Sequence, residues 1–170
     1  MKIRLSVISD SESIMKIIKG AQKLLASLNI DQWQDGYPNE VQILNDIKNN
    51  ESYVILNKEQ KIIATFMFTT NKEPNYSIID GEWLTNNLAK YGVIHRVAVS
   101  QKTTNKGIAK HIISYCEASL KKQEIPAMRI DTHNDNLGMQ HILNKLSYIY
   151  CGIITVTNGD SRLAFEKLLQ

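Results

Sequence analysis

The sequence predicts a single α/β domain over residues 1–170, built around one mixed β-sheet with helices packed against it. The length of 170 residues is that of one ordinary domain. Hydrophobic residues make up 43% of the chain and charged residues 22%, which is enough for a core without disulfides. The hydrophobic patterns follow the order β-α-α-β-β-β-α-β-α-β-β. This order favours a mixed sheet over a sheet made of βαβ repeats throughout.

In the first half of the chain, the spacing of apolar residues alternates between that of strands and that of helices. Polar and apolar side chains alternate at residues 2–7, as in a half-buried strand. The capping residues Ser9 to Glu12 precede apolar positions that recur at helical spacing. The expected elements are a strand at 2–7, a helix at 14–28, a loop at 29–38, a helix at 39–47, strands at 53–56 and 62–68, and a short strand at 76–79.

The second half begins with an apolar, β-branched run and ends with a hairpin signal. The dipeptide Asn158-Gly159 between two apolar runs is typical of a two-residue hairpin turn. The expected elements are a strand at 93–99, a polar loop at 101–106, a helix at 107–122, a strand at 127–133, a helix at 136–146, and strands at 148–156 and 163–168.

Composition excludes several protein classes. Two cysteines cannot form a disulfide framework or, by themselves, a structural zinc site, so no metal is expected. The first residues lack the continuous apolar core of a signal peptide, and no apolar run approaches the roughly 18 residues of a membrane span. These features predict a soluble, cytoplasmic protein that does not act at a membrane.

The net charge of +3 is concentrated in one segment. Residues 95–122 contain six Lys or Arg residues and one acidic residue, so the remainder of the chain is slightly negative. A nucleic-acid-binding surface is one reading of such a basic segment. The apolar stripe at 108, 112, 116 and 120 and the scarcity of aromatic residues for base stacking argue against it. We therefore expect no nucleic-acid partner.

The same segment has the layout of an anion site. A strand runs into a polar loop, and a helix opens at Gly107, where backbone N–H groups and the helix dipole attract negative charge. Ala109 keeps the first turn narrow, and Lys102, Lys106 and Lys110 add positive charge. The P-loop and GxGxxG signatures are absent, so the expected ligand is a phosphate or pyrophosphate of another kind. The alternative is a strand–turn–helix with an incidental glycine.

Residues 104–109 resemble the pyrophosphate loop of the GNAT (Gcn5-related N-acetyltransferase) family, [RQ]-x-x-G-x-[GA]. Gly107 and Ala109 match this pattern, whereas Thr104 replaces the usual Arg or Gln. The run before the loop looks like the family's fourth strand, whose backbone pairs with the pantetheine arm of coenzyme A. The resemblance implies coenzyme A contacts at Val97, Ala98, Val99, Thr104, Asn105, Lys106, Gly107, Ile108, Ala109 and Lys110.

Residues 136–148 resemble a second family segment, N-x-x-[AM]-x-x-L-Y-x-K-x-G-F. Asn136 and Lys145 align, and Asn136 is a further implied cofactor contact. Leu143 occupies the place of the tyrosine that protonates the leaving thiolate in many relatives. The family fold implied is a mostly antiparallel sheet splayed between two central parallel strands, here 93–99 and 127–133, with acetyl-CoA bound where they part.

The resemblance implies an N-acetyltransferase that transfers the acetyl group of acetyl-CoA to a primary amine of a small molecule or peptide. The amine attacks the thioester directly, so the two cysteines need not be nucleophiles. Relatives often dimerise, so a homodimer is one assembly open to this chain, and the sequence does not decide its oligomeric state. An acyltransferase using another acyl-CoA is one alternative, and a non-catalytic CoA-binding or regulatory module, suggested by Leu143, is another.

His95 is the first candidate for the base that deprotonates the amine. It shares strand parity with Val93, Val97 and Val99, and imidazole exchanges a proton near neutral pH. A packed or substrate-contacting histidine is the alternative. Glu82 is a rival base, or a ligand for a cationic amine, and Tyr148 is a candidate acid.

Two clusters of aromatic and acidic residues in loop-like regions are candidates for the acceptor pocket. Such clusters can form a binding wall for a small cationic amine, or their rings can simply cover the edge of the core. The candidate acceptor residues are Trp33, Tyr37, Tyr76, Glu82 and Trp83. The many Asn, Lys and Ile residues suggest an AT-rich bacterial genome.

Overall fold

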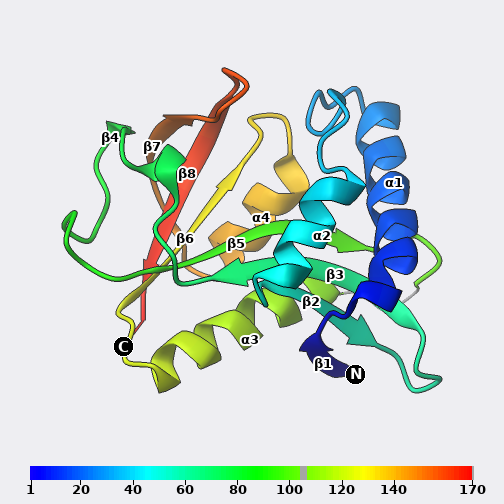
Figure 1. The fold of residues 1–170 in the computed structure, drawn as a ribbon. Helices are drawn as coiled ribbons and strands as arrows, with labels where there is room; N and C mark the ends of the chain where they lie inside the picture. Colours follow the sequence, from blue (N-terminus) through cyan, green and yellow to red (C-terminus); the bar gives the residue numbers. More distant parts are fainter. Residues whose placement is uncertain (104–106, 170) are drawn as a thin grey trace. The chain divides into compact units, whose positions relative to one another are not determined.

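The computed structural model describes residues 1–103 and 107–169, and in this part of the chain it confirms the predicted mixed α/β fold (Figure 1). Its elements are β1 (Lys2–Leu5), α1 (Ser11–Ser27), α2 (Glu40–Lys48), β2 (Ser52–Leu56), β3 (Ile62–Thr69), β4 (Asp80–Gly81), β5 (Gly92–Val99), α3 (Ile108–Lys122), β6 (Ala127–Thr132), α4 (Leu137–Lys145), β7 (Ile149–Thr155) and β8 (Ser161–Leu168). The sheet order is β1-β2-β3-β5-β6-β8-β7-β4.

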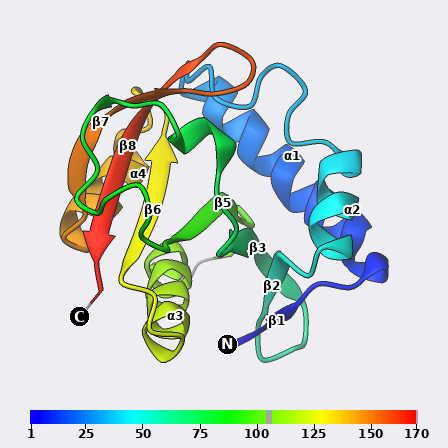
Figure 2. The same cartoon turned by 60° about the vertical axis from the view of Figure 1, so that its left-hand side comes forward.

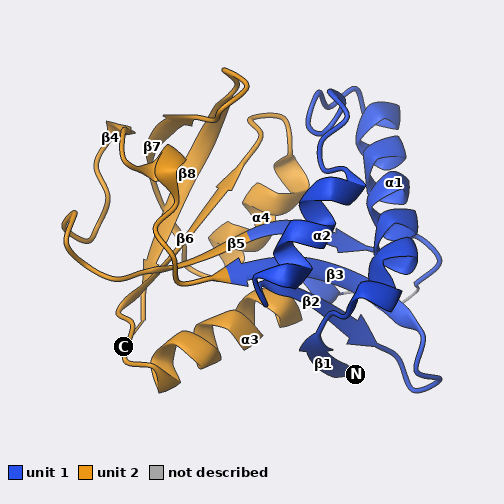
Figure 3. Cartoon of the chain, in the orientation of Figure 1, with its two compact units in different colours: residues 1–68, 95–109 blue, residues 69–94, 110–170 orange. Residues whose placement is uncertain are grey.

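The chain divides into two compact units (Figure 3). Unit 1 comprises residues 1–68 and 95–109, and unit 2 comprises residues 69–94 and 110–170. Strand β5 and helix α3 each contribute to both units.

Unit 1 packs two amphipathic helices on antiparallel strands. Strand β2 pairs with β1 and with β3, so Lys2 lies opposite Leu56 and Ser52 lies opposite Met67. Helices α1 and α2 lie side by side in Figures 1 and 2, and Asn39 caps α2 by accepting a 3.0 Å hydrogen bond from the Gln42 N–H. The apolar faces of these elements share one core, made of Ile14, Ile17, Ile18, Ile43, Ile47, Val54 and Ala98.

Unit 2 contains the parallel pair of the sheet. The first residues of β5 pair with β6 in parallel, and β6 pairs with β8 in antiparallel, which places Arg129 opposite Glu166 and Met128 opposite Lys167. Lys167 forms 3.0 Å contacts with Glu117 of α3, so α3 covers the Met128 and Lys167 face. Arg129 and Glu166 therefore face the loop that leads from β3 to β5.

Two local expectations are wrong. The short strand predicted at 76–79 is a 3₁₀ turn at Pro74–Tyr76 followed by irregular chain. Glu73 caps this turn by accepting a 3.2 Å hydrogen bond from the Asn75 N–H, and Pro74 presets its first dihedral. In β5, Arg96 has a left-handed φ of 54°, which interrupts the pleat, so the parity argument for His95 does not hold.

Candidate functional site

The predicted anion site begins at the end of β5 in unit 1. Ala98 packs in the core of unit 1, whereas Val97 and Val99 are half-buried. The N–H of Ser100 donates a 2.8 Å hydrogen bond to the carbonyl of Ile63, which anchors the chain as it leaves the strand. Residues Thr104, Asn105 and Lys106 of the predicted site lie outside the described residues.

Gly107 leads directly into the 15 residues of α3. Its φ of 88° lies in the left-handed region that favours glycine, and a Cβ built there would meet no described atom within 4 Å. Ile108 is 2% exposed and anchors the first turn, while Lys102 and Lys110 are exposed. A left-handed glycine at the start of a helix leaves room for a ligand beside the backbone, and the anion site at this position stays a prediction.

The centre of β5 holds a buried charge that the sequence analysis missed. The Arg96 guanidinium donates to both carboxylate oxygens of Asp46 on α2, at 2.8 and 2.9 Å. Both side chains are less than 10% exposed. A signal was present, since Asp46 falls between Ile43 and Ile47 on the apolar face of α2 and a charge there requires a buried partner.

The other predicted residues of unit 1 are His95, Trp33 and Tyr37. His95 is half-buried in β5, next to Arg96. Trp33 packs against the core of unit 1, and Tyr37 accepts a hydrogen bond from Arg96. Unit 1 thus contains those described residues up to Ala109 that are predicted to contact coenzyme A, together with one candidate base and two candidate acceptor residues.

Unit 2 places Tyr76 and Trp83 in its hydrophobic core. They are 3% and 7% exposed, and the Trp83 indole N–H donates a 3.1 Å hydrogen bond to the Tyr76 carbonyl. The Arg129 guanidinium carbon lies 4.1 Å from the Trp83 ring centroid and 4.0 Å from that of Tyr91. Such burial leaves the rings of Tyr76 and Trp83 little surface for a ligand. It agrees with the alternative given in the sequence analysis, in which these rings cover the core instead of binding the acceptor.

The buried Arg129 is neutralised by Glu166. Their closest contact is 2.9 Å, Glu166 is fully buried, and Thr85 donates hydrogen bonds to the same carboxylate. These hydrogen bonds attach the loop before β5 to strands β6 and β8. Trp83 lies two residues before Thr85 in that loop, so the same bonds hold its indole against Arg129. Glu82 is exposed and is held through its backbone N–H, 2.9 Å from the Cys151 carbonyl.

Asp131 on β6 is a half-buried carboxylate that the sequence analysis did not single out. It accepts a 2.7 Å hydrogen bond from the Tyr76 hydroxyl. Burial, followed by the charge of Asp131, raises the pKa of Tyr76 well above its usual value. Tyr76 therefore stays a neutral hydrogen-bond donor near neutral pH.

The helix-to-strand segment 136–148 contains one helix cap and two buried side chains among its predicted residues. The Asn136 side chain caps α4 by accepting a 3.1 Å hydrogen bond from the Met139 N–H. Leu143 is fully buried, and Tyr148 is 3% exposed. Burial raises the pKa of the Tyr148 phenol, and the charge of Glu117 raises it further, which disfavours an ionised phenolate. The acid role of Tyr148 and the cofactor role of Asn136 stay predictions.

Both cysteines are buried and free. Burial raises the thiol pKa of Cys116 and of Cys151, which disfavours the nucleophilic thiolate. Within residues 1–103 and 107–169, no group of three or more His, Cys, Asp or Glu side chains is arranged to hold a metal ion. In the same described ranges, no helix combines the length and apolar character that a membrane crossing needs.

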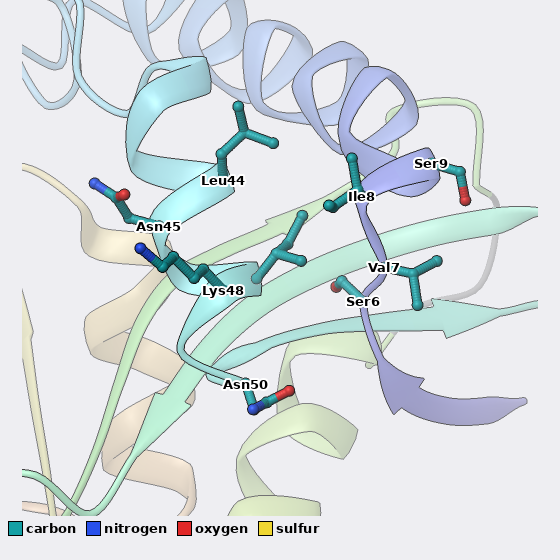
Figure 4. A pocket seen from close by; sticks show the side chains of 9 residues that line it. Ser6, Val7, Ile8, Ser9, Leu44, Asn45, Lys48 and Asn50 are labelled. Carbon is teal, nitrogen blue, oxygen red and sulfur yellow. The ribbon is translucent and has the colours of Figure 1, made fainter.

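A hollow of about 710 Å³ lies in unit 1 between the chain after β1 and helix α2 (Figure 4). Val7, Ile8 and Leu44 give it an apolar character, and Lys48 is the one ionisable side chain among its described lining residues. It contains none of the residues predicted for cofactor, acceptor or catalysis. We therefore do not assign it to the candidate site.

Two of three comparisons relate the chain to known proteins. The sequence model of the acetyltransferase (GNAT) family matches residues 18–148. A GNAT-family acetyltransferase from Streptococcus agalactiae is 34% identical with a TM-score of 0.87, and the match covers 99% of this chain and 95% of that one. The search of curated proteins gave no match.

More distant solved structures share the fold. A GNAT-family acetyltransferase from Listeria monocytogenes is 16% identical with a TM-score of 0.78, over 99% of this chain and 94% of that one. A ribosomal-protein-alanine N-acetyltransferase from Brucella melitensis is 12% identical with a TM-score of 0.69, over 99% of this chain and 100% of that one.

Proposed function

Because the chain belongs to the GNAT acetyltransferase family, we propose that it transfers an acetyl group from acetyl-CoA to a primary amine in the bacterial cytoplasm. The family uses acetyl-CoA as its cosubstrate. The observation that carries the proposal within this chain is the left-handed Gly107 at the start of α3, directly after β5 and its loop.

The residues present fit coenzyme A chemically. Backbone groups of Val97, Ala98 and Val99 would pair with the amides of the pantetheine arm, as an added strand does. The N–H groups at the start of α3, with Gly107, would receive the pyrophosphate, and exposed Lys110 would add charge. No described atom lies within 4 Å of a Cβ built at Gly107, so a phosphate could approach the backbone closely.

Acetyl-CoA supplies an acetyl group activated as a thioester. The amine nitrogen forms a bond to the acetyl carbon while the carbon–sulfur bond breaks, and the leaving sulfur takes up a proton. The amine must first lose its own proton, since a free alkylammonium has a pKa near 10. We assign the removal of this proton to His95, the first residue of β5 after its buried start, and we keep Glu82 as the second candidate.

Release of free CoA thiol tests the proposal. Purified protein is mixed with acetyl-CoA and a panel containing a linear diamine, a peptide with a free N-terminus and a peptide whose only amine is a lysine. We expect thiol release with at least one amine class, together with acetylated amine of matching yield by mass spectrometry. Binding of acetyl-CoA without thiol release on any amine would refute the transferase activity.

One observation favours a second function. Leu143 is fully buried at the place where many relatives carry the acid tyrosine, so a hydroxyl is absent from that position. A non-catalytic CoA-binding module would bind acetyl-CoA and release no thiol. The same panel therefore separates the two functions.

A further inference from the structure

Arg96 combines a strained backbone with a fixed side chain. Its φ of 54° places a residue that carries a Cβ in the left-handed region, which is sterically unfavourable for every residue except glycine. A residue keeps such a conformation where its surroundings over-determine it. The Arg96 side chain is 7% exposed and forms an ion pair with Asp46, whose side chain is 5% exposed.

Asp46 holds the guanidinium in one orientation. Arg96 Nε donates to Asp46 Oδ2 at 2.8 Å, and Arg96 Nη2 donates to Asp46 Oδ1 at 2.9 Å, so the pair is bidentate. Gln42 of α2 donates a further 2.9 Å hydrogen bond to Asp46 Oδ1. The carboxylate is therefore fixed from its own helix and from β5 at once.

The third donor of the guanidinium reaches the loop between α1 and α2. Arg96 Nη1 donates to the Tyr37 hydroxyl oxygen, and the guanidinium carbon lies 5.9 Å from the Tyr37 ring centroid. The Gln22 side chain of α1 holds the same end of the loop, since its Nε2 donates to the carbonyls of Tyr37 and Pro38 at 3.1 and 3.3 Å. All of these groups lie in unit 1.

This geometry links two parts of the proposed site. The backbone of residue 96 continues directly into Val97–Val99, the proposed pantetheine contact. Its side chain ends on Tyr37, a 36% exposed residue that is a proposed acceptor contact. A planar guanidinium can serve Asp46 and Tyr37 together, whereas a lysine ammonium cannot reproduce this fork.

We propose that the buried Arg96–Asp46 ion pair positions Tyr37. Through Tyr37 it holds the loop between α1 and α2 next to β5, the strand whose backbone is proposed to contact the cofactor. Acceptor binding then depends on this pair through Tyr37, and acetyl-CoA affinity does not depend on the Tyr37 hydroxyl. The proposal rests on the proposed acetyltransferase function for its kinetic part only.

Tyr37→Phe is the sharpest test, because it removes one hydroxyl and leaves the Arg96–Asp46 ion pair intact. Loss of a hydrogen bond to a charged group should raise the acceptor KM by about tenfold. The Kd for acetyl-CoA should stay within about twofold of the wild-type value. Tyr150→Phe, at a 53% exposed tyrosine of β7, is the matched control and should change neither constant.

Arg96→Lys and the double variant with Tyr37→Phe test whether Arg96 acts through Tyr37. If it does, the acceptor KM of the double variant equals that of Arg96→Lys alone. Additive effects of the two substitutions would overturn the proposal. An unchanged acceptor KM in Tyr37→Phe, or an equal loss of acetyl-CoA affinity, would overturn it too.

Hydrogen exchange separates this inference from the proposed function. In Tyr37→Phe, amides of residues 31–37 should exchange several-fold faster than in the wild type, and amides of β2 should not change. Unchanged exchange at 31–37 would show that Arg96 does not hold the loop, whatever the protein catalyses. Faster exchange in a protein that releases no thiol would leave the positioning role of the ion pair in place and refute the acetyltransferase function alone.

Discussion

Gly107→Glu should weaken acetyl-CoA binding by about 30-fold relative to Gly107→Gln. The two substitutions have nearly the same shape and impose the same backbone strain, since Gly107 has a φ of 88°. They differ in one negative charge at the start of α3. The comparison therefore isolates the electrostatic part of the proposed pyrophosphate site.

The magnitude follows from the exposure of Gly107. A Cβ there would meet no described atom within 4 Å, so the new carboxylate would stay in water and keep its charge. Two unit charges about 4 Å apart in water interact by about 1 kcal/mol. A pyrophosphate with about two charges then loses about 2 kcal/mol, which is about 30-fold in Kd.

Calorimetric titration with acetyl-CoA measures both affinities, and thermal unfolding checks the fold. Both variants should lose about 1–2 kcal/mol of stability from the left-handed backbone, and their melting temperatures should agree closely. Equal Kd values for Gly107→Glu and Gly107→Gln would refute the pyrophosphate site at this helix start. A variant that unfolds would be visible in the thermal scan before any titration.

Three further predictions concern a base, a core residue and a partly buried ion pair. His95→Ala should lower kcat by about 100-fold with an unchanged Kd for acetyl-CoA, and an unaltered pH–rate profile would remove His95 as the base. Leu143→Tyr should destabilise the protein by about 1–3 kcal/mol without raising turnover, because Leu143 is fully buried; higher turnover in a stable variant would contradict this. The hydrogen bond from Arg4 lowers the pKa of Asp10, so Asp10→Asn should cost about 1 kcal/mol above about pH 5 and progressively less as pH falls below about 4; a pH-independent cost in urea unfolding would exclude the ion pair as its cause.

The periodic elements could be predicted because their signals are local. The apolar residues of α1 and α3 recur at helical spacing, and the chain does turn at Asn158-Gly159. The loop is longer than the two-residue turn that the dipeptide predicts, because the Val156 N–H bonds the Asp160 carbonyl and only Gly159, with a φ of 92°, is left-handed. Gly107 was singled out for the same reason, because a glycine between a polar loop and a helical stripe is visible without knowledge of distant residues.

The rest of the site depends on contacts between residues far apart in the chain. Tyr76 and Trp83 look like loop aromatics in the sequence, whereas in the structure they join one buried cluster and the Trp83 indole packs against Arg129, 46 residues later. The left-handed backbone of Arg96 depends in the same way on Asp46, 50 residues earlier. No local pattern reports such pairs, although an isolated charge in an apolar run shows that some partner must exist.

The central claim is that the predicted cofactor contacts at residues 97–99 and 104–110 bind acetyl-CoA, and calorimetric titration of the wild-type protein tests it most directly. We predict saturable binding at one site per chain, with a Kd on the order of 1 μM to 1 mM, the usual range of Michaelis constants. The absence of binding heat, together with an unchanged melting temperature at millimolar acetyl-CoA, would contradict it.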